Sequence, residues 1–258
     1  TLVRTIKENK TEFLSDNAVD GIFDKDENKL WYIANTIIYS KDLKNNGLNM
    51  FVPNGPRSNT SWCLKYSDGR IFSVPGGRWD DNYHTNGTLS IFEDGIWDGY
   101  PSPYFEEKTT TTSTCYDLVD IAINPQDKTN FWVASYGLGL YEFRNDKLYK
   151  FHNCDNSGLL SFYQDKPASV RHNYTCTDGM TYDNEGNLWI LNNGGSLIKY
   201  IDPNGVYHNM PYSVSASTPE DILISNLNPN QKFVLITRYK SSTSTLLFSF
   251  DDNGTLEQ

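Results

Sequence analysis

Arginine and aromatic side chains gather in a few long, irregular segments of this 258-residue chain, and such side chains are well suited to bind a partner. A guanidinium group forms forked hydrogen bonds with carboxylates and phosphates, while aromatic faces suit sugar rings, peptides and cations. The pattern therefore predicts a binding site for an anionic glycan or for a loop of a partner protein. The residues that we expect to form this site are Arg57, Arg78, Trp79, Tyr83 and Tyr136.

The alternative interpretation is that these side chains stabilise the irregular segments themselves. The aromatic rings would then pack the segments against each other. The arginines would pair with nearby carboxylates, for which the candidates are Asp80, Asp81, Asp117 and Asp165. We favour this structural role for any one residue taken alone, and a binding role for the surface as a whole.

No motif in the sequence predicts catalysis or a bound metal. The histidines lie outside any HExxH, HxH or GxSxG pattern; they are His84, His152, His172 and His208. The stretch DKDEN at 24–28 alternates oxygen ligands as calcium loops do, but it lacks the glycine and the terminal glutamate of an EF-hand. We interpret it as a turn. We therefore expect no cofactor and no enzymatic activity.

The four cysteines show no CxxC spacing, which argues against a zinc site. Cys154 and Cys176 flank one irregular segment, so a disulfide between them, or from Cys115 to one of them, is geometrically allowed. Such a bridge would indicate an oxidising compartment. Free thiols are the remaining alternative.

Charge and hydrophobicity narrow the class of protein. The formal net charge of −10 argues against a general nucleic-acid or anionic-membrane surface, which needs clustered lysine and arginine. No apolar run approaches the roughly 20 residues of a membrane span, so we expect no direct membrane insertion. The content of 38% hydrophobic and 14% aromatic residues is enough for a sizeable core.

The elements that must position the irregular segments repeat along the chain. Five segments combine an apolar strand, an Asp/Asn/Gly turn and a second apolar strand, and each is followed by another hairpin. Four-stranded units that recur about every 40 to 50 residues are typical of a β-propeller. A β-sandwich explains neither the repeat nor the recurring tryptophan. The aligned aromatic positions are Trp31, Phe72, Trp132, Trp189 and Phe233, at spacings of 41, 60, 57 and 44 residues.

We predict an all-β propeller of four-stranded antiparallel blades. The five full blades are expected at 17–57, 58–113, 114–174, 175–218 and 219–258. Residues 1–16 match the last hairpin of a preceding blade. Because five blades and a half do not make a usual closed ring, we expect the chain to be part of a larger propeller protein.

In a four-stranded blade with strands A to D, the A–B and C–D turns lie on one face of the disc and the B–C and D–A connections lie on the other. The A–B and C–D turns are short here, so we interpret their face as a plain base. Long connections on a rigid scaffold usually carry binding functions. The long segments all belong to the second class, at 53–61, 75–87, 100–117, 152–177 and 237–244.

Two resemblances to known families support this interpretation. Segments 183–200 (DNEGNLWILNNGGSLIKY) and 129–151, followed by NSGLLS, resemble the propeller repeats of the periplasmic sensor domains of Bacteroidetes hybrid two-component regulators. Segment 55–97 resembles PorZ-like propeller proteins of the type IX (Por) secretion system. The residues that carry the second resemblance are Gly55-Pro56, Ser58-Asn59, Gly76-Gly77-Arg78-Trp79 and Trp97.

The PorZ-like resemblance implies a non-enzymatic protein that is exported to the periplasm or the outer-membrane cell surface. It further implies a role in attaching anionic lipopolysaccharide to secreted cargo, with other secretion-complex proteins or an anionic glycan as partners. The alternative is the periplasmic sensor propeller of a hybrid two-component regulator, which would bind an oligosaccharide. A propeller lyase is the third and least favoured alternative, because it needs a histidine with an acid or metal partner at the central channel.

Overall fold

The computed structural model describes residues 2–4, 11–13, 18–34, 37–52, 54–78, 82–109, 114–211, 217–225, 228, 230–238, 245–250 and 256–257. The chain divides into two compact units, Thr1–Gly55 and Pro56–Gln258. Strands dominate both units, and the only helices in the described part of the chain are short. These are α1 (Ser102–Glu106), α2 (Ala168–Arg171) and a 3-10 turn at His172–Tyr174. Within those ranges, no helix is long and apolar enough to cross a membrane.

The first unit holds one hairpin and one four-stranded sheet. Strand β1 (Leu2–Arg4) pairs antiparallel with β2 (Thr11–Phe13). The sheet, which we call the first blade, has its strands in sequential order and antiparallel throughout. They are β3 (Ala18–Asp24), β4 (Lys29–Ala34), β5 (Ile37–Asp42) and β6 (Leu48–Phe51).

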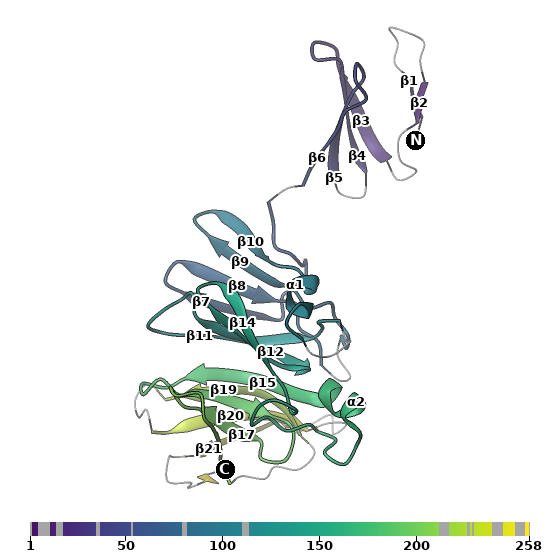
Figure 1. Cartoon of the computed structure of the whole chain (residues 1–258). Helices are drawn as coiled ribbons and strands as arrows, with labels where there is room; N and C mark the ends of the chain where they lie inside the picture. The colour runs from purple at the N-terminus through teal and green to yellow at the C-terminus, as the bar shows by residue number, and fades with distance from the viewer. Residues whose placement is uncertain are drawn as a thin grey trace. The chain divides into compact units, whose positions relative to one another are not determined.

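The second unit holds four further groups of four sequential antiparallel strands (Figure 1). The second blade consists of β7 (Cys63–Ser67), β8 (Arg70–Val74), β9 (Leu89–Glu93) and β10 (Ile96–Tyr100). The third consists of β11 (Leu118–Ile123), β12 (Phe131–Gly137), β13 (Gly139–Arg144) and β14 (Lys147–His152). The fourth consists of β15 (Thr175–Tyr182), β16 (Leu188–Asn192), β17 (Ile198–Ile201) and β18 (Tyr207–Asn209). The fifth consists of β19 (Ser217–Ile224), β20 (Lys232–Arg238), β21 (Thr245–Phe250) and β22 (Leu256–Glu257).

The predicted fold class, an all-β propeller of four-stranded antiparallel blades, is thereby confirmed. The first strands β7, β11, β15 and β19 contact one another in this order and form the inner edge of the second unit. The third and fourth blades are also hydrogen-bonded to each other, because the end of β12 pairs with the start of β15 at Tyr136–Cys176 and Gly137–Thr175.

The core of the second unit lies between its blades. Phe72 and Val74 of the second blade pack with Phe131 and Val133 of the third in one apolar cluster. Two further clusters join the third blade to the fourth and the fourth to the fifth. In β16 all five residues are buried, as expected of a strand that is covered on both faces. Blade-to-blade packing is therefore the main hydrophobic contribution to this unit.

Tight turns form because their residues tolerate left-handed backbone angles. Asp68 and Gly69 have φ of 44° and 81°, and Asp94 and Gly95 have φ of 51° and 81°. Two central residues with positive φ match the right-handed twist of the flanking strands, and Asp-Gly adopts this geometry readily. These turns fix the register of each hairpin. Because they are short, they project little from the face on which the A–B and C–D turns lie.

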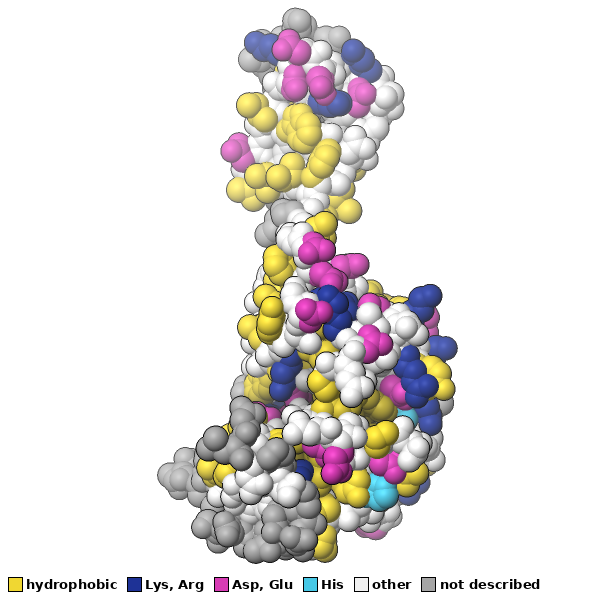
Figure 2. All heavy atoms as spheres, turned by 90° about the vertical axis from the view of Figure 1, so that its left-hand side faces the viewer, with side chains coloured by type: hydrophobic (Ala, Val, Ile, Leu, Met, Phe, Trp, Pro, Cys, Tyr) yellow, Lys and Arg dark blue, Asp and Glu magenta, His cyan; other side chains and the backbone are white. Residues whose placement is uncertain are grey.

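The first blade carries apolar side chains on its surface. Ile22, Ile33, Ile38 and Phe51 are exposed large hydrophobic residues of the first unit, and Figure 2 shows hydrophobic side chains gathered on one face of this unit. Strand pairing places Ile33, Ile38 and Phe51 opposite one another across β4, β5 and β6. One face of the first blade is therefore apolar, and the described part of the first unit leaves these four side chains exposed.

The packing between the fourth and fifth blades predicts a large effect for Leu191→Ala. Leu191 is wholly buried in the cluster that joins these blades, so its truncation should lower the free energy of unfolding by about 2 to 5 kcal/mol. Urea unfolding followed by tryptophan fluorescence measures this loss. The control is Leu223→Ala, a 57% exposed leucine of the fifth blade, which should change stability by less than about 0.5 kcal/mol. Equal losses would contradict the packing.

Candidate binding sites

The long connection between β8 and β9 is held by the chain that leads into the third blade. The wholly buried carboxylate of Asp117 accepts hydrogen bonds from the backbone N–H groups of His84 (3.1 Å) and Thr85 (2.8 Å). Asn86 forms a β-bridge with Tyr116. A Cβ on Gly77 would lie 2.0 Å from the Asp117 Oδ1 atom, so this close approach requires glycine. The connection is therefore fixed in place by the neighbouring blade.

This fixed connection forms one wall of a pocket of about 600 Å³ that we call the tyrosine pocket. The Tyr83 ring stacks on the His84 ring, with centroids 3.8 Å apart, and the His84 ring meets Tyr116 at 4.8 Å. Tyr83 is 40% exposed. The pocket offers aromatic faces and amides, which suit a peptide or a sugar ring. It is lined by Tyr83, His84, Asn86, Thr114, Cys115, Tyr116, Asn173 and Tyr174.

Arg78 is buried, in contrast to the surface position that its binding role requires. Its Nε atom donates to Oδ2 of Asp178 at 2.6 Å, and the two side chains are only 8% and 1% exposed. The guanidinium group also lies over the Trp62 ring, 5.0 Å from the centroid. Arg78 therefore stabilises the contact between the second and fourth blades.

Asp178 belongs to a group that we call the inner aspartates, Asp120, Asp178 and Asp221. Each lies next to the residue that bulges from the first strand of its blade. Lys65 Nζ lies 3.0 Å from Asp120 Oδ1, and the Cys63 thiol donates to the same oxygen at 3.2 Å. Burial raises the pKa of Asp178 to about 7 against the opposing effect of Arg78, and burial also raises the pKa of Asp221. These residues form a charged network at the inner edge.

Sequence reasoning missed the inner aspartates. The signal was present, because an aspartate recurs at the start of each matching strand in AVDGIF, LVDIAI, CTDGMTY and PEDILI. In each of these strands the aspartate stands among small and apolar residues, as an exposed polar residue of an alternating strand would. The pattern therefore does not distinguish a buried carboxylate from an exposed one.

The other predicted residues occupy separate environments. Tyr136 is wholly buried, and its hydroxyl accepts a hydrogen bond from Asn193 Nδ2 at 3.4 Å. The backbone N–H of Arg57 donates to Ser90 Oγ at 2.8 Å, and its guanidinium group lies 3.3 Å from Asp98. Trp79, like Asp80 and Asp81, lies outside the described residues. Tyr83 is therefore the predicted residue that the structure places in the tyrosine pocket.

The histidines are engaged in local contacts. His152 Nε2 lies 2.9 Å from Glu142 Oε2, and its Nδ1 lies 3.0 Å from the Tyr207 hydroxyl. His172 and His208 each approach an aspartate, Asp155 and Asp202 respectively, at 3.1 Å. Across the described ranges, no three His, Cys, Asp or Glu side chains form a group that could hold a metal ion.

The disulfide that the sequence allows between Cys154 and Cys176 is not formed, and Cys63 and Cys115 are free as well, which agrees with the alternative of free thiols. The Cys154 backbone N–H donates to the hydroxyl of Thr175, while its sulfur faces Asp155 Oδ1 at 3.7 Å. Neighbouring residues of a strand point to opposite faces. Because Thr175 faces Cys154, the adjacent Cys176 points away, into the core between the third and fourth blades.

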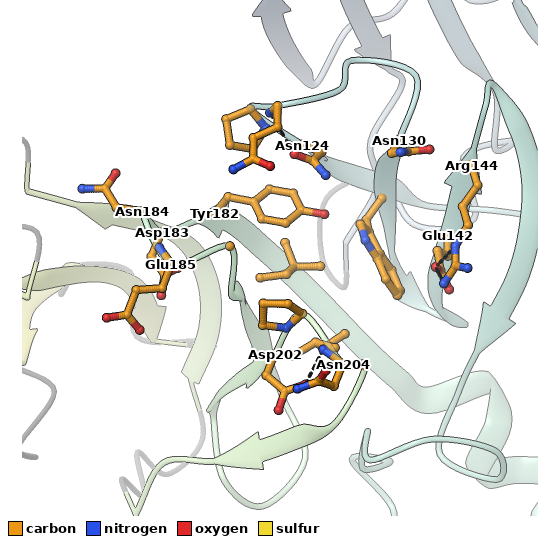
Figure 3. A pocket seen from close by; sticks show the side chains of 18 of the residues that line it. Asn124, Asn130, Glu142, Arg144, Tyr182, Asp183, Asn184, Glu185, Asp202 and Asn204 are labelled. Atoms are coloured by element: carbon orange, nitrogen blue, oxygen red, sulfur yellow. Dashed lines mark hydrogen bonds and ion pairs between the residues drawn. The ribbon is translucent and has the colours of Figure 1, made fainter.

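A groove of about 620 Å³ opens on the opposite side of the second unit, where the A–B and C–D turns lie. We call it the turn-face groove. Figure 3 shows Tyr182 in the middle of this groove, with Glu142 and Arg144 toward one side and Asp183 and Glu185 toward the other. The face that the short turns were expected to leave plain therefore carries a groove.

Comparison with known proteins identifies the fold. No protein-family model matches the chain, and no curated protein matches it. Its structure is similar to that of PorZ, an essential bacterial surface component of the type IX secretion system of Porphyromonas gingivalis, with 22% sequence identity and a TM-score of 0.74. The similarity covers 96% of this chain and 33% of the PorZ chain. The predicted PorZ-like propeller is thus confirmed as a fold.

Two other solved structures are less similar. The extracellular domain of a putative hybrid two-component system from B. thetaiotaomicron has 12% identity and a TM-score of 0.49, over 95% of this chain and 28% of that one. Virginiamycin B lyase from Staphylococcus aureus has 13% identity and a TM-score of 0.42, over 93% of this chain and 83% of that one.

The buried ion pair predicts that Arg78→Met destabilises the protein strongly. Removal of Arg78 leaves the buried Asp178 carboxyl without its charged partner, either ionised and unpaired or forced to take up a proton, so the free energy of unfolding should fall by about 3 to 5 kcal/mol. The double variant Arg78→Met/Asp178→Leu should recover most of that loss, as measured by urea unfolding. Arg57→Met removes an exposed pair with Asp98 and should cost less than about 1 kcal/mol. A double variant no more stable than the single one would contradict this account.

Burial of Asp117 predicts a stability that decreases as pH rises. Burial raises the pKa of Asp117 from 3.8 to about 7, so between these values the folded state binds a proton that the unfolded state has released. The stabilisation is complete below pH 3.8 and is lost progressively up to pH 7, by about 1.4 kcal/mol per pH unit within that window. Urea unfolding at several pH values should show a shallower dependence for Asp117→Asn. The exposed-turn control Asp94→Asn should keep the wild-type slope, and identical slopes for all three proteins would exclude Asp117 as the cause.

Proposed function

We propose that the chain belongs to a non-enzymatic, exported propeller protein that acts as a binding component of a secretion complex. PorZ, whose fold it shares, is a surface component of the type IX secretion system. The structural similarity extends over 96% of this chain, and segment 55–97 resembles PorZ-like proteins in sequence as well. Because the chain spans about a third of the PorZ length, the partners of the whole protein are part of the proposal.

The tyrosine pocket is the observation that carries the binding role. Its aromatic rings stand on a connection that Asp117 and the Asn86–Tyr116 bridge hold in one conformation. A pre-ordered aromatic site loses little conformational entropy when a partner binds. Tyrosine also offers a large contact area and a hydroxyl group together. The pocket therefore suits a segment of another secretion-complex protein or a glycan.

The arginines contribute less to this role than the tyrosines do. Arg57, Arg78 and Arg171 each lie beside a carboxylate, namely Asp98, Asp178 and Asp155. A guanidinium group that is already paired has fewer donors left for an anionic ligand. Recognition at this face is therefore expected to depend on aromatic contact, with hydrogen bonds from amides and hydroxyls.

The role predicts a secretion defect that depends on Tyr83. Deletion of the gene in its natural host should leave type IX cargo proteins absent from the cell surface, as measured by surface proteolysis and immunoblotting. Complementation with the full natural protein should restore attachment, while the Tyr83→Ala variant should restore it at least about tenfold less well, because an aromatic anchor is lost. Tyr83→Phe should complement well. Tyr66→Ala, at a 73% exposed tyrosine of β7, is the matched control.

Two results would oppose this proposal. Normal cargo attachment in the deletion strain would exclude a secretion role. If the same strain instead lost a transcriptional response to an oligosaccharide, the sensor alternative would be supported. Equal complementation by Tyr83→Ala and Tyr66→Ala would leave the secretion role intact but would remove the tyrosine pocket from it.

A further inference from the structure

The junctions between blades in the second unit follow one rule at the turn face. Each blade of this unit has one aromatic residue at the equivalent position of its second strand, namely Phe72, Trp132, Trp189 and Phe233. At each junction, the residue that precedes this aromatic residue in one blade lies near the equivalent aromatic ring of the blade before it. Phe131 meets Phe72 with ring centroids 5.1 Å apart. Lys232 places its Nζ atom 4.5 Å from the centroid of Trp189. Leu188 holds the matching position before Trp189, and it shares an apolar cluster and the lining of the turn-face groove with Trp132.

This rule explains why the turn-face groove opens where it does. A phenylalanine or an extended lysine covers much of the ring below it, whereas Leu188 is shorter. The groove beside Trp132 has a volume of about 620 Å³, which lies within the usual range of ligand sites. Trp132, Tyr182 and Leu188 all line it.

The neighbouring junction shows which chemistry suits such a ring. The Lys232 side chain is only 2% exposed and stands over the indole of Trp189. The pocket around it shares Asp183, Asn184 and Glu185 with the turn-face groove. The A–B turn of the fourth blade therefore presents the same acidic residues to two tryptophan sites, and one of them already holds an ammonium group from the chain itself.

Neighbouring side chains hold the Trp132 ring in one orientation. Its ring lies 4.9 Å from the His152 ring, and His152 is fixed by Glu142 at 2.9 Å and by the Tyr207 hydroxyl at 3.0 Å. Trp132 also forms a side-chain hydrogen bond with Tyr182. The indole is therefore ordered before any ligand arrives, which lowers the entropic cost of binding.

The charge around the groove favours a cation. Within the described lining, the sole basic side chain is Arg144, and it is paired with Glu142 Oε1 at 2.6 Å. The acidic residues of the lining are Glu142, Asp183, Glu185 and Asp202. Four carboxylates and one guanidinium group give a formal charge of −3 for the lining. Such a site attracts a basic group and repels an anionic one.

We infer that the turn-face groove binds a basic side chain, a lysine or arginine of a partner polypeptide, with its cationic head over Trp132 and beside the turn that carries Asp183 and Glu185. The bound group would repeat, from outside, the contact that Lys232 makes with Trp189. Cation–π attraction and the nearby carboxylates supply the recognition. This site is separate from the tyrosine pocket and does not depend on the proposed function.

The test uses capped pentapeptides of glycine with a central lysine, norleucine or glutamate. Each is titrated into the 258-residue chain at constant ionic strength, and the indole N–H signals are followed by NMR. The lysine peptide should shift the Trp132 signal saturably, and the norleucine peptide should bind at least about tenfold more weakly. The glutamate peptide should not shift it. Equal shifts with the lysine and norleucine peptides, or no shift with the lysine peptide, would overturn the inference.

Variants separate this site from general attraction to an acidic protein. Glu185→Gln, at an exposed turn position, should weaken the lysine peptide about fivefold. The matched variant Glu107→Gln removes the same charge at another exposed position and should leave the affinity unchanged. Leu188→Lys should abolish binding by placing an internal ammonium over Trp132. Because Leu188 is buried, circular dichroism checks that the Leu188→Lys variant is folded. If Leu188→Lys is unstable, the comparison of Glu185→Gln with Glu107→Gln decides the outcome. Equal affinity of the two glutamine variants would also overturn the inference.

Discussion

The need of successive blades to cover the apolar faces that they turn toward one another is the constraint on which the second unit depends. A single four-stranded sheet with hydrophobic residues on both faces is unstable in water until other sheets cover them. Successive blades meet this need through three apolar clusters. The backbone connections must then lie at the two rims, because the faces are occupied. One rim becomes a set of long connections and the other a set of tight turns.

Charge is placed at the inner edge, where the first strands converge. Asp120 is paired with Lys65, and Asp178 is paired with Arg78, across different blades. Buried pairs contribute little net stability, but a missing partner is costly, so they favour the one arrangement in which both partners meet. This explains why Arg78, on a connection rich in aromatic residues, serves the fold. The same connection still supplies Tyr83 to the tyrosine pocket.

The fold was predictable because its signals are local. The aligned aromatic positions, the Asp-Gly turns and the alternation of strands indicate four-stranded units without any knowledge of distant contacts. The site was less predictable because its contacts are distant. Arg78 and Asp178 are separated by 100 positions, and no local pattern shows that a connection folds back onto another blade. Tyr136 appears as an aromatic residue near a glycine, yet the pairing of β12 with β15 buries it.

The acidic character of the turn face follows from how the turns are made. Asp183 accepts hydrogen bonds from the backbone N–H groups of Glu185 and Asn187, and Asp202 accepts them from Asn204 and Val206. Aspartate is favoured at such positions because its side chain satisfies backbone donors. Each of these two hairpins thus adds a negative charge to this rim as a by-product of folding. Whether a ligand can reach a tryptophan on this rim then depends on one neighbouring residue. Lys232 covers the ring of Trp189, whereas the shorter Leu188 leaves the ring of Trp132 accessible from the groove.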